Sequence, residues 1–356
     1  MNKRVTMEMI AEACQTSIGT VDRALNNRAD INPETKKNIL ETAWRLGYKT
    51  NKLAGALSRK KPLRMAFIYP SLPDGFYQNI TAGIGKAANE LEPYGVEFDT
   101  LHFDARDPQT ELELLESFRA EDYDAVAINP QDVGCADYIR RFVRAGVPTA
   151  TFNNDLPDSG RLFYVGEDAE LSGRMGADVL GTLLNGEGGV TVMGNFVHAK
   201  PFFERFEGFC SVVQKHYPGI TVYSCADCRL DEELTMQNIQ NLLEQTRTIR
   251  GIFCAGYFST IGTIEALRRL HRQDIMLVGY DVSPTTARAV RDGLCRVLLY
   301  QDPYQQGYQT ASLLARHLLE GWRPVSGRLL IETRLVFRQN IGNYESGMTL
   351  WDQAVL

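Results

Sequence analysis

The side chains with the clearest binding chemistry in this sequence follow runs of apolar residues. Amide, carboxylate and guanidinium groups bind pairs of hydroxyl groups, and aromatic rings cover the C–H faces of a sugar-like ring. Ten positions of interest follow such runs: Asp74, Phe76, Tyr77, Asn153, Asn154, Arg205, Cys228, Tyr257, Asp281 and Gln301. Together these residue types predict a binding site for a small polyhydroxy molecule, such as a sugar or a polyol.

The charges in this set leave a second class of ligand open. Arg205 and Asp281 form a pair of opposite charge, and such a pair would also tolerate a nucleobase, an amino acid or a phosphorylated compound. We expect a sugar or polyol as the first choice and a metabolite of these other classes as the alternative.

Motifs that would indicate an enzyme are missing from the sequence. The five histidines are scattered, and no HExxH, GxSxG or Walker motif occurs. The glycine-rich residues 186–189 precede a predicted strand instead of linking a strand to a helix, so they are no dinucleotide fingerprint. We therefore expect no enzyme activity, no catalytic residues and no cofactor.

The seven cysteines are also scattered along the chain. Cys225 and Cys228 have CxxC spacing, but no second Cys or His pair stands near them. We expect buried free thiols and no metal site.

A second group of residues with recognition chemistry lies in the first sixty positions. Thr6, Ser17 and Asn32 are good N-cap residues and predict three helices at residues 7–13, 18–26 and 33–46. A three-residue break separates the first two helices, which is the outline of a helix-turn-helix. In this motif the second helix enters the major groove of DNA.

The beginning of the second helix would then face the bases. Arg23 can bind guanine in bidentate fashion, Ile18 can contact a thymine methyl group, and Gly19 lies beside them. Hydroxyl and amide groups nearby can bind phosphates: Thr6, Ser17, Thr20 and Asn26. The alternative for an isolated bundle of this kind is a surface that docks another protein.

The distribution of charge favours DNA. The whole chain has a net charge of −6, which by itself argues against a nucleic-acid partner. Residues 1–61 carry 12 Lys and Arg against 6 Asp and Glu, whereas the remainder carries 26 basic and 38 acidic residues. A basic head on an acidic body is typical of a nucleic-acid-binding module on a larger carrier.

A specific set of residues spans the same region: Val5, Thr6, Ile10, Ala11, Ser17, Thr20 through Asn26, Thr35, Ala43, Leu46 through Tyr48, and Asn51. Over about 58 residues this set closely resembles the headpiece of the lactose/galactose-repressor family. The resemblance implies a DNA-binding headpiece at residues 1–50 and a hinge helix with linker at residues 51–62. It also implies that Asn51 contacts DNA and that Leu57 wedges between base pairs in the minor groove.

Two residues depart from the family pattern. Asp22 stands where many members have Ser, and an acid beside phosphates repels them unless it is paired. Gln15 stands where a Gly is common in the turn, which predicts a slightly strained turn. Both departures leave the operator sequence open.

The body of the chain alternates apolar strand-like runs with helical segments. About ten strands alternate with helices between residues 63 and 345, which predicts parallel sheets with helices on both faces. This many strands indicates two Rossmann-like lobes. We expect lobe 1 at about 63–164 and 301–328, and lobe 2 at about 165–300 and 329–345. The chain would cross between the lobes near 163–165, 300–302 and 327–329. Ligands of such folds bind beyond the carboxyl ends of the strands, here between the lobes.

Several segments of the body carry a further resemblance. They are Phe76-Tyr77, residues 127–130, residues 204–209, residues 278–281 and Gln301. They resemble the ribose-type periplasmic sugar-binding proteins and the sensor domain of the same repressor family, a type I periplasmic-binding-protein fold. The resemblance implies that Arg205, Asp281 and Gln301 bind the ligand.

Three departures from the ribose-binding pattern mark this cleft. Asn153-Asn154 replaces an Asp-Arg pair, Gly256-Tyr257 replaces an Asn-Asp pair, and Cys228 stands where an aromatic residue is frequent. We therefore expect a sugar-like ligand that need not be ribose.

The remaining expectations concern location and partners. No signal-peptide core and no run of about 18 apolar residues occurs, so we expect a cytoplasmic protein without a membrane span. Two headpieces must bind two half-sites, so we expect a homodimer on palindromic, double-stranded operator DNA. Repression is the expected outcome, but the residues do not tell whether the effector strengthens or weakens DNA binding.

Overall fold

The computed structural model describes residues 5–25, 31–46, 61–72, 75–195 and 200–344. The chain divides into two compact units, Met1–Arg59 and Lys60–Leu356. The predicted hinge helix at residues 51–59 lies outside the described residues, together with Asn26, Asn51, Leu57 and Asp74. In the part that is described, no helix is long and apolar enough to cross a membrane.

The first unit is a bundle of three short helices, α1 (Met7–Ala13), α2 (Ile18–Leu25) and α3 (Pro33–Leu46). Thr6 caps α1 by accepting the backbone N–H of Met9, and Asn32 accepts the N–H of Glu34 at 2.8 Å before α3. The three helices bury one small apolar core: Ile10, Ala11, Val21, Ala24, Ile39 and Ala43. Three short helices therefore form around these residues, as predicted.

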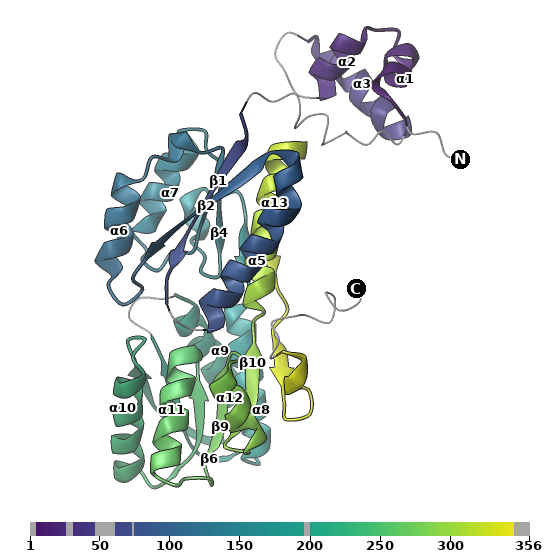
Figure 1. Cartoon of the computed structure of the whole chain (residues 1–356). Helices are drawn as coiled ribbons and strands as arrows, with labels where there is room; N and C mark the ends of the chain where they lie inside the picture. Colours follow the sequence, from purple (N-terminus) through teal and green to yellow (C-terminus); the bar gives the residue numbers. More distant parts are fainter. Residues whose placement is uncertain (1–4, 26–30, 47–60, 73–74, 196–199, 345–356) are drawn as a thin grey trace. The chain divides into compact units, whose positions relative to one another are not determined.

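The first lobe of the second unit is a six-stranded sheet in the order β11-β5-β4-β3-β1-β2. Its strands are β1 (Leu63–Pro70), β2 (Val96–Phe103), β3 (Ala125–Ile128), β4 (Thr149–Phe152), β5 (Tyr164–Gly166) and β11 (Arg328–Leu330). All of these neighbouring strands pair in parallel. Helices α5 (Gly75–Leu91) and α13 (Pro303–Glu320) bury one apolar core against the sheet, and α6 (Pro108–Ser117) and α7 (Cys135–Arg144) bury another (Figure 1).

The second lobe repeats this architecture with the order β12-β10-β9-β8-β6-β7. Its strands are β6 (Glu187–Gly194), β7 (Gly219–Asp227), β8 (Ile249–Cys254), β9 (Met276–Tyr280), β10 (Cys295–Tyr300) and β12 (Arg334–Val336). Its helices are α8 (Ala169–Leu183), α9 (Lys200–His216), α10 (Glu232–Gln245), α11 (Tyr257–Arg269) and α12 (Pro284–Arg291). The edge strand β12 is antiparallel to β10, so the prediction of purely parallel sheets is wrong for this strand.

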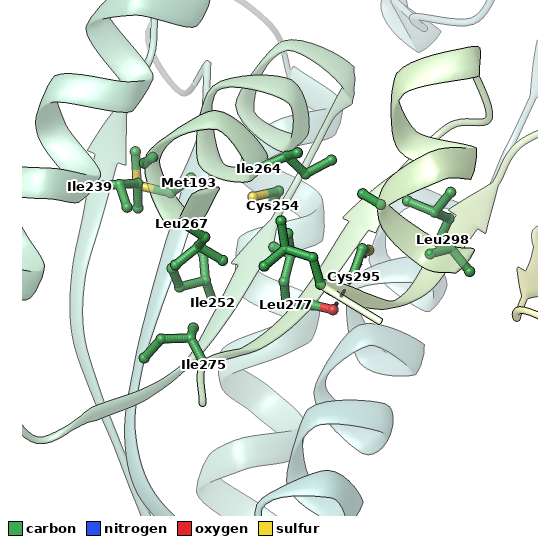
Figure 2. Close-up of a cluster of buried hydrophobic side chains, with 14 of the residues drawn as sticks. Met193, Ile239, Ile252, Cys254, Ile264, Leu267, Ile275, Leu277, Cys295 and Leu298 are labelled. Carbon is green, nitrogen blue, oxygen red and sulfur yellow. Dashed lines mark hydrogen bonds between the residues drawn. The ribbon is translucent and has the colours of Figure 1, made fainter. Parts of the chain in front are cut away.

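Two of the buried cysteines serve as apolar core residues of the second lobe. Figure 2 shows Cys254 and Cys295 among aliphatic side chains such as Ile264 and Leu277. The Cys295 thiol donates weakly to the carbonyl oxygen of Leu277 at 3.7 Å. Burial raises the pKa of both thiols above its usual range. A neutral, packed thiol is the role that their scattered positions predict.

Two of the three predicted crossings between the lobes are placed too early. The predicted ends of lobe 1, at 164 and 328, fall inside β5 and β11, which pair with each other in the sheet of lobe 1. The crossings therefore lie at 167–168, 301–302 and 331–333. Three-residue strands such as β5 and β11 are too short to show an apolar run, which explains the error.

Candidate functional site

A cleft lies between the two lobes, at the carboxyl ends of their strands. It holds about 530 Å³ of space free of protein atoms. Eight of the ten predicted residues line it: Phe76, Tyr77, Asn153, Asn154, Arg205, Tyr257, Asp281 and Gln301. Seven further residues complete the lining: Leu72, Gln131, Pro201, Phe202, Leu230, Gly256 and Phe258. The tertiary structure therefore gathers side chains from both lobes around one space.

Two predicted residues are not among those that line the cleft. Asp74 lies outside the described residues. Cys228 is buried, and its backbone N–H donates to the carbonyl oxygen of Gly194 at 2.9 Å. Arg229 and Leu230 both have positive φ angles, of 47° and 56°, and this turn brings Leu230 to the cleft in place of Cys228.

Arg205, on α9, is the centre of the polar side of the cleft. Its guanidinium donates through Nε to Oε1 of Glu167 at 2.7 Å, and its Nη2 donates to the same oxygen. Nη1 donates to the carbonyl oxygen of Ala255, and Nη2 also donates to Oε1 of Gln301 at 3.3 Å. The guanidinium carbon lies 4.1 Å from the centre of the Tyr280 ring. These contacts hold the charged head in one orientation.

The balance of these contacts keeps Arg205 charged. Burial by itself would lower the pKa of the guanidinium, but the adjacent Glu167 carboxylate raises it, and the net result lies above the ordinary value. Arg205 and Glu167 are 3% and 2% exposed, so water does not screen this ion pair effectively. The pair is therefore a permanent feature of the site at neutral pH.

The same cluster joins the three crossings between the lobes. Glu167 lies in the first crossing, Gln301 in the second and Thr333 in the third. Oε1 of Glu167 accepts from Arg205, which also donates to Gln301, and Oε2 accepts from the Thr333 hydroxyl at 2.9 Å. Hydrogen bonds of this cluster therefore connect all three crossings.

Amide groups extend this network into lobe 1. Nε2 of Gln301 donates to both carboxylate oxygens of Asp281, at 3.2 and 3.4 Å. Nδ2 of Asn153 donates to Oε1 of Gln301 at 3.4 Å and to Oε1 of Gln306 at 3.1 Å. Nδ2 of Asn129 in turn donates to Oδ1 of Asn153 at 3.3 Å. Planar groups from both lobes thus meet at the second crossing.

The backbone conformation of Asn153 and Asp281 sets the direction of their side chains. Asn153 follows β4 in lobe 1 and has a φ angle of 61°. Asp281 follows β9 in lobe 2 and has a φ angle of 60°. Asn and Asp are the non-glycine residues that adopt this left-handed region most readily. Their backbone N–H groups donate at 2.9 Å to Val165 and Leu299. The chain therefore turns at each strand end while the side chain faces the cleft.

Aromatic rings form the apolar part of the lining. Phe76 and Tyr77 begin α5, with ring centres 5.2 Å apart and nearly perpendicular planes. Tyr257 and Phe258 begin α11 in a similar arrangement, with centres 5.3 Å apart. Each lobe thus supplies an aromatic pair from the first turn of a helix, and such rings can cover the C–H faces of a bound ring.

A buried carboxylate supports the loop that carries Gln131. Glu111, on α6, is fully buried and accepts the backbone N–H groups of Gln131 and Asp132 at 3.0 and 3.1 Å. Burial raises the pKa of Glu111 to about 7, although the neighbouring Cys135 and these N–H groups lower it. Gln131 donates to Oδ1 of Asn129 at 3.0 Å, so this carboxylate is linked to the amide network.

Sequence reasoning alone misses several of these residues. Glu167 and Thr333 lie in the crossings, where no local pattern marks them, and Gln306 lies inside α13. Their roles arise from partners that are distant in the sequence.

The predicted DNA-facing residues lie on and before α2. Ile18 is 48% exposed at the start of this helix. The Ser17 hydroxyl accepts the N–H of Thr20 at 3.1 Å and lies 2.9 Å from the Thr20 hydroxyl. Arg23 is exposed, and its Nε donates to the carbonyl oxygen of Gly19 at 3.2 Å.

The predicted strain in the turn before α2 is present. Gln15 has a φ of 51°, in the left-handed region that favours glycine. Thr6 caps α1, and Asn26, Asn51 and Leu57 lie outside the described residues.

Comparison with known proteins finds similarity over most of the chain. The model of a family described as a periplasmic binding protein domain matches residues 65–321. The ribose import binding protein RbsB of Salmonella typhimurium is 24% identical and aligns with 77% of this chain and 90% of its own length. The ribose operon repressor of Halalkalibacterium halodurans is 23% identical and aligns with 94% of this chain and 96% of its own length.

Among solved structures, a solute-binding protein of an ABC transporter from Burkholderia graminis, in complex with D-arabinose, has the same fold. Its TM-score is 0.75 at 21% sequence identity, with coverage of 81% of this chain and 99% of that protein. This TM-score shows that the two-lobed unit and the solute-binding protein share a fold.

Proposed function

The chain belongs to the periplasmic binding protein domain family, and we propose that it is a DNA-binding transcriptional regulator whose operator affinity responds to a sugar, a polyol or a similar small molecule. The resemblance to the lactose/galactose-repressor family is confirmed by repressor relatives, one of which aligns with the headpiece and the body together. The proposed regulator is a homodimer that acts as a repressor on palindromic operator DNA.

One observation carries the sensor part of this proposal. Arg205, Gln301 and Asp281 form a continuous hydrogen-bonded row in a cleft between two lobes, flanked by aromatic pairs from both. Planar polar groups with aromatic neighbours are suited to a polyhydroxy ring. The solved relative that holds D-arabinose in the same fold supports this class of ligand.

The DNA-binding part rests on the first unit. We propose that Ile18, Gly19 and Arg23 contact base edges in the major groove. Hydroxyl and amide groups of Thr6, Ser17, Thr20 and Asn26 bind phosphates. In the hinge, Asn51 contacts the DNA and Leu57 inserts into the minor groove.

The proposed coupling between the two parts is a change in lobe orientation. The ligand binds groups from both lobes, so it favours the closed arrangement over the open one. The three crossings move with this closure, and the spacing of the two hinge segments in a dimer changes with it. Operator affinity then shifts by the difference between the ligand affinities of the two states.

A thermal-shift screen of the full-length protein tests the sensor proposal. The panel holds sugars, polyols, sugar phosphates, nucleobases and amino acids. A ligand at 100 times its Kd stabilises the folded state by about 2.7 kcal/mol, and a hit among the sugars or polyols is the expected result. Hits confined to nucleobases, amino acids or phosphorylated compounds would replace the ligand class while keeping the regulator.

A matched pair of variants assigns the hit to the cleft. Asp281→Asn should lower the affinity for the hit about tenfold or more, because a hydrogen bond to a buried carboxylate is lost. Asp292→Asn, at the exposed end of α12, should leave it unchanged. Operator binding with and without the hit then decides whether the effector weakens or strengthens DNA binding.

A further inference from the structure

We propose that Glu111, a buried carboxyl group that does not line the cleft, is a positioning residue of the effector site: it holds the backbone of Gln131, and its ionised form favours effector binding. The inference rests on the proposed function of the cleft as an effector site. It adds to that function a dependence of effector affinity on pH, which originates behind the lining of the cleft.

The loop after β3 connects the cleft with this carboxyl group. Gln131 lines the cleft. Its backbone N–H donates to Oε2 of Glu111 at 3.0 Å and lies 3.2 Å from Oε1. The next N–H, that of Asp132, donates to Oε2 at 3.1 Å. Glu111 therefore holds two consecutive N–H groups at the point where the loop presents the Gln131 side chain to the cleft.

The Gln131 side chain continues the connection toward the second crossing. Its Nε2 donates to Oδ1 of Asn129 at 3.0 Å, and Nδ2 of Asn129 donates to Oδ1 of Asn153 at 3.3 Å. Nδ2 of Asn153 donates to Oε1 of Gln301 at 3.4 Å. Asn153 and Gln301 also line the cleft. A ligand that contacts Gln131 thus contacts a loop that hydrogen bonds join both to Glu111 and to the amide network.

The two protonation states of Glu111 bind the loop differently. A carboxylate accepts hydrogen bonds at both oxygens, whereas a protonated carboxyl group carries a hydrogen atom on one of them. Hydrogen bonds to the charged form are also the stronger ones. Burial raises the pKa of Glu111 to about 7, although the N–H groups of Gln131 and Asp132 lower it. Both states are therefore populated near neutral pH.

The groups around Glu111 come from the elements that pack against α6. On α7, the Cys135 thiol faces the carboxyl group, and burial raises the pKa of this thiol above its usual range. In the loop, the Asp132 carboxylate raises the pKa of Glu111. On β2, His102 is directed to β1, with Nδ1 3.2 Å from the carbonyl oxygen of Tyr69. Cys135 therefore stays uncharged near neutral pH, while Glu111 changes its charge there.

Thermodynamic reciprocity gives the direction of the effect. An effector that contacts Gln131 stabilises the loop conformation in which the N–H groups reach the Glu111 carboxylate. Effector binding therefore favours the ionised form, lowers the pKa of Glu111 and releases a proton. In return, ionisation of Glu111 raises the effector affinity. The affinity accordingly increases as the pH rises through about 7, the pKa of Glu111 in the folded chain.

Titration calorimetry on the full-length protein tests the inference. The probes are D-ribose, D-arabinose, D-galactose, D-glucose and myo-inositol, none of which ionises between pH 6 and 8.5, and the tightest binder is used. We expect its affinity to rise about three- to tenfold over this range. Parallel titrations at pH 7 in buffers of different ionisation enthalpy should show release of a fraction of a proton.

Three variants assign the effect. Glu111→Gln cannot ionise, so the pH dependence and the proton release should disappear. Glu113→Gln is the matched control, because it removes the same charge from an exposed position on the same helix and should keep both. Gln131→Ala should weaken binding and lose most of the pH dependence, because its loop then lacks the side chain that reaches the probe.

The outcomes separate this inference from the function on which it rests. A wild-type affinity that is constant with pH, without proton release, would overturn the role of Glu111 and leave the sensor intact. So would a pH dependence that persists in a folded Glu111→Gln variant, even if that variant binds more weakly. If Glu111→Gln does not fold, persistence of the pH dependence in Gln131→Ala has the same meaning.

The choice of probe does not leave the inference untested. If none of the five neutral compounds binds, the tightest compound of the wider panel replaces them, and the difference between the wild type and Glu111→Gln decides. Absence of binding by every compound of the panel would overturn the sensor proposal itself, and this inference with it.

Discussion

A Cβ atom added to Gly173 would overlap the carbonyl oxygen of Arg205. The relationship is reciprocal, because a Cβ atom added to Gly208 on α9 would overlap the carbonyl oxygen of Glu170 on α8. The two helices thus touch through their backbones at a pair of glycines. This close approach places the backbone of Arg205 near the first crossing, which carries Glu167.

We predict that Gly173→Ala lowers both stability and effector affinity. The new methyl group must push α9 away and shift Arg205, and overpacking of this kind costs about 1–3 kcal/mol. Urea unfolding and effector titration measure the two effects. Gly85→Ala is the control, because Gly85 is an exposed helical residue with open space around it. This variant should be slightly more stable than the wild type. Equal behaviour of the two variants would contradict the backbone contact.

The buried pair of Arg205 and Glu167 should show strong coupling in a double-mutant cycle. Arg205→Met and Glu167→Leu each leave one buried charge without its partner, and each should cost about 3–5 kcal/mol. The double variant should lose far less than the sum, because both charges are removed together. Urea unfolding of the full chain measures the cycle.

An exposed pair provides the comparison for this cycle. Arg269 and Glu265 lie four residues apart on α11, 2.8 Å from each other and about half exposed. Their coupling should be about 0.3–0.5 kcal/mol. A similar, small value for the buried pair would show that Glu167 and Arg205 act independently.

Stability should decrease as pH rises from about 4.5 to 7, with Glu111 as one cause. Burial raises the pKa of Glu111 from 4.5 to about 7. In this range the folded chain holds a proton that the unfolded chain has released, so each rise in pH favours unfolding. The effect is at most about 3 kcal/mol.

Two variants isolate this contribution. Glu111→Gln cannot ionise, so the difference in unfolding free energy between it and the wild type should change with pH across this window. Glu113 is an exposed position on the same helix, so the unfolding free energy of Glu113→Gln should change with pH as that of the wild type does. Denaturation at several pH values between 5 and 8 provides the measurement, and a Glu111→Gln curve parallel to the wild type would refute the assignment.

Arg23→Ala should weaken specific operator binding by about 1–3 kcal/mol and relax the base preference at one position. The reason is the loss of a bidentate contact to guanine. Fluorescence anisotropy on the operator and on random DNA measures both effects. Arg45→Ala, on the exposed side of α3, should change binding to both DNAs by similar, small amounts. An equal loss on random DNA for Arg23→Ala would reduce its role to phosphate binding.

Much of the local structure of this protein follows from the sequence by itself. The predicted bounds of α1 and α3 agree with the structure, because N-caps, apolar periodicity and breaker residues act between neighbours along the chain. The two-lobed α/β fold also follows from the regular alternation of strands and helices. Eight of the ten predicted residues line the cleft, because the carboxyl ends of parallel strands converge on one edge.

Other features were decided only by the tertiary structure. The strands β5, β11 and β12 exist because a sheet edge offers them hydrogen-bond partners, and their three residues carry too little pattern to be predicted alone. Glu167 meets Arg205 across 38 residues and Thr333 across 166. Burial and charge pairing of this kind depend on which chain segments the fold brings together. The sequence therefore determined which groups could bind a ligand, and the packed lobes decided which of those groups are already engaged with one another.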